Sequence, residues 1–416
     1  MPIRFNKVHA QSAMISILLV GVGAAAGFKL GRDGSLIGPA LKPARSEYKL
    51  VNIFKPSEFE DIDFQFFWEV WQLLELQYLK PEQIIPSKMV HGAISGMVAS
   101  LSDPYTSYLP PEENKRTAED LQGSFYGVGI QLGYIDQTLA VITPLKGSPA
   151  EQSGVQAGDL ILKVIDPGKN FDEPTTGWSL SEAVTHIRGE RGTSVTLNLY
   201  RPGQNPEPFD VEIKRDEILV PSVEVSFVDV GDKRDALLEV SRFGERTNEE
   251  WNLAVTQILA EKSRLDGVVL DMRNNPGGVF DEAINMASEF VGDGVIVTQS
   301  GRYDSQPFYS TGRDRLSGMK LVVLVNKGSA SASEIVAGAL RDRLGVKLVG
   351  QKTFGKGTVQ DRHPLSNEGA VHITVARWLL PGGSWIHEEG IPVDIEVDDD
   401  PETEQDEVLE RAVGVL

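Results

Sequence analysis

Cysteine is missing from all 416 residues of the sequence. Its absence excludes disulfide bonds, cysteine-ligated zinc, iron–sulfur clusters, thiol catalysis and lipid attachment through a cysteine. A nucleophilic side chain in this protein must therefore be a hydroxyl, an amine or a carboxylate. The cellular compartment stays open, because a chain of this length can bury a sizeable core without disulfide bonds.

Basic side chains are scarce relative to acidic ones. There are 40 Lys and Arg against 60 Asp and Glu, which gives a formal net charge of -20. Binding to duplex nucleic acid needs clustered Lys and Arg that displace counterions, so we expect no nucleic-acid partner. Hydrophobic residues make up 41% of the chain, which is typical of a folded protein, and the length predicts about two to three domains.

One uncharged, almost wholly apolar run, Ala13 to Phe28, lies near the N-terminus. Arg4 and Lys7 precede it, as in a signal peptide or on the cytoplasmic side of a membrane anchor. A helix of this length rises about 24 Å, so residues 13–30 are needed to approach the roughly 30 Å hydrocarbon core. We expect membrane binding through residues 13–30, with the rest of the chain in the periplasm or outside the cell. Alternatively, cleavage near Ala24–Ala26 releases a secreted protein.

Changes in residue pattern divide the chain into five segments of a mixed α/β, multidomain protein. We expect helices over Asp61–Leu79, where an aromatic stripe should pack on neighbouring elements, and over Ser87–Leu101. The last apolar residues, between Val408 and Leu416, should form a short helix that packs on the body of the molecule or on another subunit. The sequence therefore leaves open whether the protein is a homo-oligomer. The expected segments are a signal or anchor with linker (1–46), an N-terminal helical region (47–115), a β-rich module (116–216), an α/β core with βαβ units (217–400) and an acidic tail with a helix (401–416).

A serine-rich turn, GSASASE at 328–334, joins a predicted buried strand to a predicted helix. A hydroxyl there lies at the positive end of the helix, near free backbone N–H groups, as an acyl-transfer nucleophile requires. Taken alone, the motif favours a simpler interpretation, in which Ser331 caps the helix and Glu334 completes a capping box.

A lysine between two glycines, Lys356, lies in TFGKGTVQ at 353–360. A lone lysine is usually a solvated surface charge, but flanking glycines let the backbone approach a partner closely. Burial would lower the lysine pKa from about 10.4 toward 7 or 8, and the neutral amine could then accept a serine proton. On an extended strand Lys356, Thr358 and Gln360 point to one side, which makes Gln360 a candidate for orienting the amine.

Several motifs, in order along the chain, resemble those of the C-terminal processing peptidases, also called tail-specific proteases. The similarity covers roughly residues 60–400. It implies a serine endopeptidase with a PDZ domain at 116–216 and an α/β protease core at 217–400. The motifs that carry it are SDPYTSY (102–108), DMRNNPGG (271–278), GSASASE (328–334), FGKGTVQ (354–360) and GIPVD (390–394).

The resemblance also implies a role for individual residues. It places the nucleophile on Ser331, the general base on Lys356 and the residue that positions this base on Gln360. The backbone N–H groups of Gly277, in preference to the glycine that follows it, and of Ala332 would form the oxyanion hole. Such a Ser/Lys dyad needs no metal ion or cofactor.

In the PDZ-like module, a glycine-bracketed loop after Tyr126 would bind the substrate tail. Consecutive backbone N–H groups can bind a C-terminal carboxylate while the adjacent strand edge pairs with the peptide. The expected partners are protein or peptide substrates with apolar C-termini, cleaved near those ends. The loop alone is also compatible with an ordinary β-turn. Its residues are Gly127, Val128, Gly129 and Ile130.

Other functions remain open at this stage. The chain could be a catalytically silent PDZ scaffold that binds protein C-termini, or an α/β acyl-transfer fold acting on thioesters, which has no use for a tail-binding module. A Ser-His-Asp arrangement could use His363, His372 or His387, although none has a comparable glycine-framed motif. A metal site at His387–Glu388 lacks a spaced second histidine.

Overall fold

The structure is a computed structural model that describes residues 63–204, 206–231, 233–398 and 405–416. The predictions for residues 1–46, including the membrane segment at 13–30, lie outside these ranges. Among the described residues, no helix is long and apolar enough to cross a membrane. The described residues divide into two units, one at 63–84 and one that begins at Ile85.

In the first unit, the predicted aromatic helix is α2 (Gln65–Gln77), and the short 3-10 helix η2 (Pro81–Gln83) follows it. The rings of Phe67, Trp68 and Trp71 contact one another, with centroids 4.9–6.0 Å apart. None of the residues of α2 is buried, so the expected packing of this stripe on neighbours is not seen in the part that the structure describes.

The second unit begins with α3 (Pro86–Ala99), as the sequence predicts within one or two residues at each end. The short strand β1 (Ser107–Leu109) and the helix α4 (Pro111–Gln122) follow. Gly123, with φ +70°, ends α4 in the left-handed conformation that glycine favours. An ion pair between Glu119 and Arg188 (3.4 Å) and a hydrogen bond from Arg116 to Thr185 (3.0 Å) join α4 to the next module.

Residues 124–219 form the predicted β-rich module. Its main sheet has the order β3-β4-β5-β7-β8, with β6 paired to β5, and β2 pairs with β9. A capping box of Ser179 and Glu182 begins α6. The elements are β2 (Ser124–Gly127), β3 (Ile130–Ile135), β4 (Thr138–Pro144), α5 (Pro149–Gln152), β5 (Leu160–Asp166), η3 (Pro167–Lys169), β6 (Phe171–Pro174), α6 (Leu180–Ile187), β7 (Ser194–Tyr200), β8 (Phe209–Lys214) and β9 (Asp216–Leu219).

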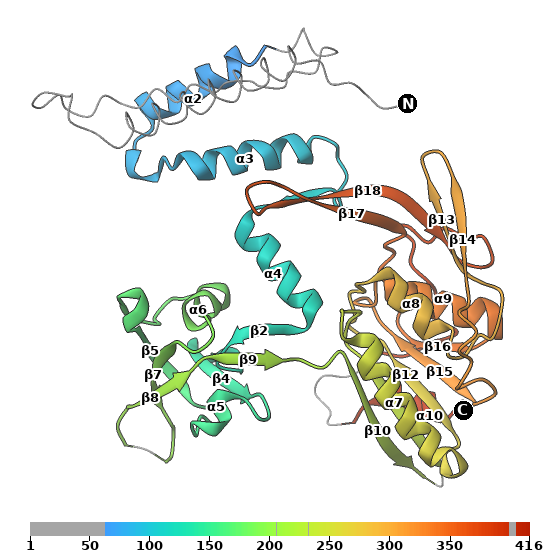
Figure 1. Ribbon diagram of the computed structural model, residues 1–416. Coiled ribbons are helices and arrows are strands. Elements are labelled where there is room, and N and C mark those ends of the chain that lie inside the picture. Colours follow the sequence, from blue (N-terminus) through green and yellow to red (C-terminus); the bar gives the residue numbers. More distant parts are fainter. Residues whose placement is uncertain (1–62, 205, 232, 399–404) are drawn as a thin grey trace, which may run out of the picture. The chain divides into compact units, whose positions relative to one another are not determined.

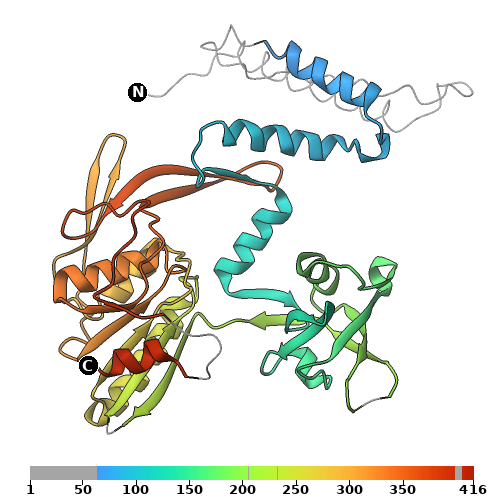
Figure 2. The same cartoon turned by 180° about the vertical axis from the view of Figure 1, so that it is seen from behind.

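The α/β core is built on a six-stranded sheet of order β10-β11-β12-β15-β16-β19, in which all neighbours after β11 are parallel. Side chains of successive strand residues alternate between two hydrophobic clusters. One cluster includes α7, α8 and α9, and the other includes α10, so helices cover both faces (Figures 1 and 2). The elements are β10 (Val223–Val230), β11 (Lys233–Val240), α7 (Thr247–Glu261), η4 (Lys262–Arg264), β12 (Gly267–Asp271), α8 (Phe280–Ala287), β15 (Leu321–Val325), α9 (Ala332–Leu344), β16 (Lys347–Gly350), β19 (Ile395–Glu396) and α10 (Glu407–Val413).

A second sheet of the core joins segments that are far apart in sequence. Its order is β1-β18-β13-β14, and β17 also pairs with β18. Figure 1 shows the long β17–β18 ribbon beside the short strand β1, with which β18 pairs. These strands are β13 (Val295–Gly301), β14 (Ser305–Tyr309), β17 (Thr358–Pro364) and β18 (Ala370–Leu379).

The predicted fold class, mixed α/β with several domains, is confirmed. The parallel sheet places the turns that follow β12 and β15 at the same edge, because carboxyl ends of parallel strands lie together. These two turns are the predicted DMRNNPGG and GSASASE motifs.

Candidate active site

The turn between β15 and α9 presents Ser331 at the start of a helix, as the sequence predicts. Ser331 has φ +55° and ψ -115°, a conformation that a residue with a side chain rarely adopts. Two hydrogen bonds fix the turn: the backbone N–H of Ala330 and the hydroxyl of Ser333 both donate to the carbonyl of Asn275, each at 2.9 Å. These hydrogen bonds hold the backbone on either side of Ser331 and so stabilise its strained conformation.

Ser331 lines a pocket of about 490 Å³ whose walls come from α4, the 276–280 turn, α9 and the strands β17 and β18. All five residues that the sequence assigns to the catalytic centre line this one pocket. They are Ser331, Lys356, Gln360, Gly277 and Ala332. None of the four residues predicted to bind the substrate tail lines it.

Lys356 lies in the loop before β17, not on an extended strand as predicted. The register also shifts between Val359 and Gln360, so the simple alternation of side chains was the wrong reason for grouping Lys356 with Gln360. The glycines on either side have the predicted role. A Cβ atom on Gly355 (φ +96°) would lie 2.8 Å from the backbone nitrogen of Gly390, and one on Gly357 would lie 2.7 Å from Trp385.

The ammonium of Lys356 is in a partly buried environment, 5.2 Å from the centre of the Tyr105 ring. Burial lowers the pKa of Lys356 below its usual value, and the carboxylates of Glu334 and Asp103 oppose this shift only in part. A lowered pKa increases the fraction of neutral amine near neutral pH, which is the form that can accept a proton.

A fully buried carboxylate, Glu334, connects the serine turn to the lysine loop. It accepts the backbone N–H of Ser331 at 2.8 Å and of Lys356 at 2.9 Å. It also accepts the N–H of Gly355 at 2.7 Å and the hydroxyl of Thr353 at 2.6 Å. Burial raises the pKa of Glu334, against the lowering effect of these four hydrogen bonds. The sequence indicated only the capping contact, because the partners at 353–356 come close only in the folded chain.

Gln360 is in the pocket but makes no hydrogen bond to Lys356 among the described contacts. Its side-chain nitrogen donates to the hydroxyls of Thr358 at 2.9 Å and Thr374 at 3.1 Å. Within the described part of the chain, the structure likewise shows no hydrogen bond between Lys356 and the hydroxyl of Ser331.

The backbone donors near Ser331 differ in their availability. The N–H of Gly277 donates to the side-chain oxygen of Asn275 at 2.9 Å. The N–H groups of Gly278 and Ala332 have no hydrogen-bond partner in the ranges that the structure describes. A Cβ atom on Gly277 would lie 2.8 Å from Cβ of Ser331, so only glycine allows this close approach.

Of the three histidines considered as alternatives, His372 lines the pocket and His363 and His387 do not. Burial lowers the pKa of His372, and the cations Arg362 and Lys356 add to this shift. The ring of His387 stacks on Trp385 with centroids 5.0 Å apart. No group of three or more His, Asp or Glu among the described residues could hold a metal ion.

The predicted tail-binding loop joins β2 to β3, and residues at the start of α5 donate hydrogen bonds to its carbonyl groups. The carbonyl of Val128 accepts the N–H of Ala150, and the carbonyl of Gly129 accepts the hydroxyl of Ser148 at 3.0 Å. Gly129 has φ +76°, and a Cβ atom there would lie 2.4 Å from Ser148. The strand β3 is at the edge of its sheet, so one side of its backbone is not paired within that sheet.

A strained serine turn beside a partly buried lysine, carried by an α/β core with a separate β-rich module, is the architecture of a serine peptidase with an accessory binding domain. Sequence comparison agrees, because the model of Peptidase family S41 matches residues 235–397 and the PDZ domain model matches residues 117–200. The N-terminal domain of the activating protease CtpB matches residues 45–113. The core of the chain is similar to peptidase family S41, and the predicted resemblance to the C-terminal processing peptidases is confirmed.

Two curated relatives are similar over most of this chain. The carboxy-terminal processing protease CtpA of Bacillus subtilis is 39% identical over 305 residues, which cover 73% of this chain and 63% of that protein. A probable CtpA-like serine protease of Staphylococcus epidermidis is 37% identical over 332 residues, 79% of this chain and 64% of the relative. The chain thus spans less than two thirds of the length of these relatives. A solved structure named as an S41 protease from Bacteroides fragilis shares the fold, with a TM-score of 0.54, 15% identity and coverage of 87% and 98% of the two chains.

Proposed function

We propose that this protein is a serine endopeptidase that cleaves exported proteins near their C-termini through a dyad of Ser331 and Lys356. The observation that carries this proposal is the convergence of Ser331, a lysine of lowered pKa and free backbone donors in one pocket. The match to the model of peptidase family S41 supports the hydrolytic activity, and the match to the PDZ domain model supports recognition of a peptide.

In the proposed mechanism, neutral Lys356 takes the hydroxyl proton of Ser331 as Oγ attacks the substrate carbonyl carbon. The carbonyl oxygen becomes an oxyanion, stabilised by the N–H of Ala332 and an N–H of the Gly277–Gly278 pair. The lysine then gives the proton to the leaving amine, which departs with the C-terminal product. Water attacks the acyl-enzyme in the same way and releases the N-terminal product.

Gln360 is proposed to orient the amine of Lys356 during this cycle. Its side-chain nitrogen is engaged by two threonine hydroxyls in the structure. Rotation of the Gln360 side chain would replace one of these hydrogen bonds with a hydrogen bond to the amine of Lys356. We infer that substrate binding accompanies this change, because catalytic hydrogen bonds often form only once the substrate is bound.

The PDZ domain is proposed to bind the apolar C-terminal tail of the substrate. The loop from Gly127 to Ile130 supplies backbone N–H groups for the terminal carboxylate, and the edge strand β3 supplies a surface for strand addition. Export of the protein is part of the same proposal and rests on the apolar run at 13–28.

The test is mass spectrometry of the products formed when the purified protein is incubated with whole exported proteins. We expect cleavage close to C-termini by the parent protein and none by Ser331→Ala. Lys352→Ala serves as a matched control, because Lys352 is an exposed lysine of the same segment. Tail binding by the parent protein without any Ser331-dependent cleavage would identify a silent PDZ scaffold instead.

A further inference from the structure

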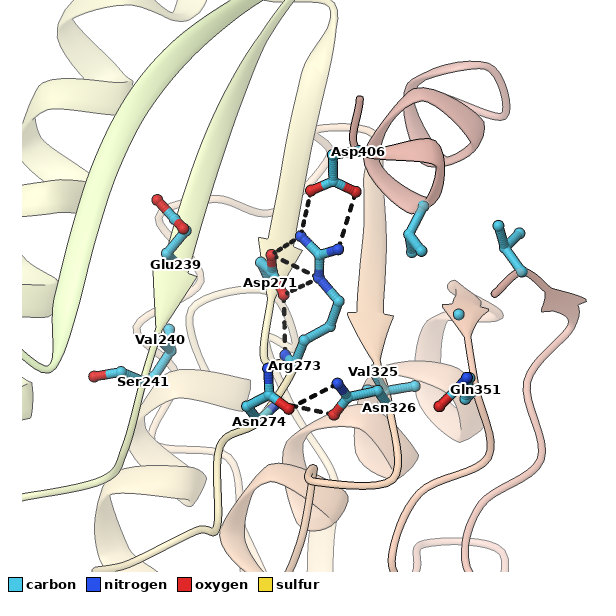
Figure 3. Close-up of a pocket in the computed structure, with 13 residues that line it drawn as sticks. Glu239, Val240, Ser241, Asp271, Arg273, Asn274, Val325, Asn326, Gln351 and Asp406 are labelled. Carbon is cyan, nitrogen blue, oxygen red and sulfur yellow. Dashed lines mark hydrogen bonds and ion pairs between the residues drawn. The ribbon is translucent and has the colours of Figure 1, made fainter. Parts of the chain in front are cut away.

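A second polar cluster lies at the carboxyl end of β12, in a pocket of about 430 Å³ that shares no lining residue with the pocket of Ser331 (Figure 3). Its centre is the guanidinium of Arg273, which lies between two carboxylates. The Arg273 nitrogens contact Asp271 at 2.6–3.0 Å and Asp406 at 2.7–2.9 Å. Asp271 belongs to β12, whereas Asp406 comes from the far end of the chain.

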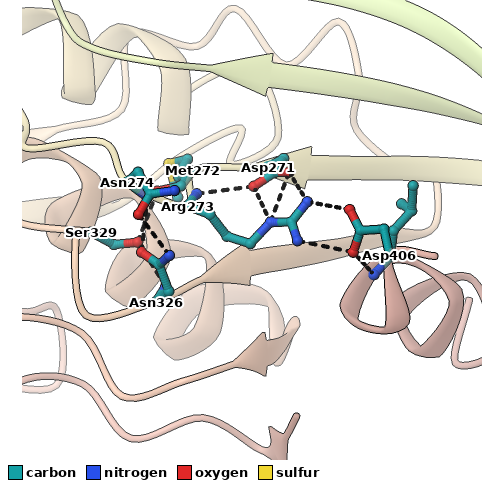
Figure 4. A network of polar contacts seen from close by, with 8 residues as sticks. Asp271, Met272, Arg273, Asn274, Asn326, Ser329 and Asp406 are labelled. Atoms are coloured by element: carbon teal, nitrogen blue, oxygen red, sulfur yellow. Dashed lines mark hydrogen bonds and ion pairs between the residues drawn. The ribbon is translucent and has the colours of Figure 1, made fainter. Parts of the chain in front are cut away.

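The backbone that follows Arg273 is tied to the serine turn by a second set of contacts (Figure 4). The N–H of Asn274 donates to the side-chain oxygen of Asn326 at 2.8 Å, and the Asn326 amide donates back to the Asn274 side chain at 2.9 Å. The hydroxyl of Ser329 donates to the carbonyl of Met272 at 2.8 Å. The turn after β12 and the turn after β15 are therefore hydrogen-bonded to each other at Met272 and at Asn274, the two neighbours of Arg273.

The same turn carries Gly277 and Gly278, whose backbone N–H groups are the proposed oxyanion donors. Asn275 accepts hydrogen bonds from Ala330 and Ser333, and Gly277 approaches Ser331 so closely that a Cβ atom would overlap with it. A displacement of the turn at Arg273 would therefore move these donors relative to the hydroxyl of Ser331.

Asp406 is the N-cap of α10. Its Oδ1 accepts the N–H of Leu409 at 2.8 Å and so caps the helix, while Val408, Ala412 and Val413 pack into the cluster on the sheet face opposite to α9. Burial alone would raise the pKa of Asp406, but hydrogen bonds from Arg273 and from the Leu409 backbone lower it, so the carboxylate stays charged. A paired guanidinium in this partly buried position is held more firmly than an exposed ion pair.

We propose that Asp406 is a positioning residue for peptide-bond hydrolysis. Acting through Arg273, it fixes the turn from Asn274 to Gly278 and with it the oxyanion donors beside Ser331. Asp406 thus contributes to catalysis through Arg273, without contacting the substrate. This inference rests on the proposed protease function.

The variant that tests it is Asp406→Ser in the full chain, because serine keeps a capping oxygen for α10 but cannot pair with Arg273. We expect kcat for a peptide substrate to fall about 5- to 50-fold, less than the roughly 100- to 1000-fold effect of removing one oxyanion donor outright. KM should stay within about twofold, because these donors act mainly in the transition state.

Two control variants separate positioning from stability. Val408→Ala loosens the packing of α10 and leaves both carboxylates in place, and Asp398→Asn removes an acid that contacts Gln351 of the same pocket. Both should keep kcat near the parent value. An unchanged kcat in Asp406→Ser, or an equal loss in Val408→Ala, would overturn the proposal.

Hydrogen exchange of the backbone amides of Asn274, Asn275 and Gly277, each hydrogen-bonded in the structure, gives a second measurement that needs no activity. Asp406→Ser should lose protection there, and Val408→Ala should not. Unchanged protection in Asp406→Ser would overturn the positioning role even in a parent protein that cleaves nothing. The absence of cleavage by the parent protein would overturn only the proposed function.

Discussion

At the scale of single residues, the chemistry depends on two charges in unusual surroundings. Lys356 is partly buried and has a lowered pKa, and the neighbouring Glu334 is fully buried with a raised pKa. The side-chain carboxylate of Glu334 accepts backbone N–H groups of both proposed dyad residues, so it fixes their positions as well as their electrostatic environment.

Lys356→Ala should abolish proteolysis while leaving the fold intact, because it removes the only proposed base without touching the backbone contacts of the loop. In the parent protein, activity should rise with pH as the ammonium loses its proton, and the lowered pKa of Lys356 should place this rise at a lower pH than for an ordinary lysine. The measurement is kcat/KM as a function of pH. Near-normal cleavage by Lys356→Ala, with Lys352→Ala as the reference, would contradict the dyad.

Glu334→Gln should lower both stability and activity. The amide has one acceptor oxygen where the carboxylate has two, so some of its four donors would be left buried without a partner. The expected loss is about 2–4 kcal/mol in the free energy of unfolding, measured by denaturant titration. The exposed Glu389→Gln should change it by less than about 0.5 kcal/mol. Equal stability of both variants would show that the hydrogen bonds of Glu334 do not stabilise the fold.

At the scale of elements, two turns at the carboxyl edge of the parallel sheet and one loop before β17 build the pocket. The turns meet because β12 and β15 are adjacent and parallel. The loop reaches them because Gly355 and Gly357 approach the backbone near Gly390 and the side chain of Trp385 more closely than any other residue could.

Gly355→Ala should therefore displace Lys356 and inactivate the enzyme. The added methyl group would lie 2.8 Å from the nitrogen of Gly390, in addition to the strain at φ +96°. Gly383→Ala is the matched control, since Gly383 has φ +84° but open space around its Cβ position. We expect Gly355→Ala to be less stable than the control by about 1–3 kcal/mol in thermal unfolding. If both variants lose the same stability and keep activity, close packing of this loop is not required.

At the scale of the whole molecule, the PDZ domain and the protease core are proposed to act on one substrate at two places. The tail-binding loop does not line the pocket of Ser331, so the two events can be separated experimentally. A change at the substrate's terminal carboxylate leaves the scissile bond untouched.

Amidation of the substrate's C-terminus should weaken tail binding roughly 10- to 150-fold, because hydrogen bonds to charged groups contribute about 1.5–3 kcal/mol. The measurement compares the cleavage rates of one protein substrate with a free and with an amidated apolar tail. An effect on KM alone indicates a tether, and an effect on kcat indicates that tail binding also activates the core. Equal rates at sub-saturating substrate would show that the loop from Gly127 to Ile130 does not recognise the carboxylate.

The sequence by itself determined the fold class and, through its resemblance to a known family, five residues of the Ser331 pocket. Local rules were sufficient for the fold class: apolar periodicity predicts helices and strands, and glycine-framed motifs mark close backbone approaches. The helix that follows Ser331 was predicted correctly for this reason.

Only the tertiary structure decided how those residues meet. Lys356 is close to Ser331 because a loop brings it there, and not because a strand alternates. The contacts of Glu334 with Thr353, Gly355 and Lys356 and the pairing of Arg273 with Asp406 join residues whose contacts no local pattern encodes. Such contacts depend on the register and packing of the whole sheet, which the order of residues along the chain does not reveal.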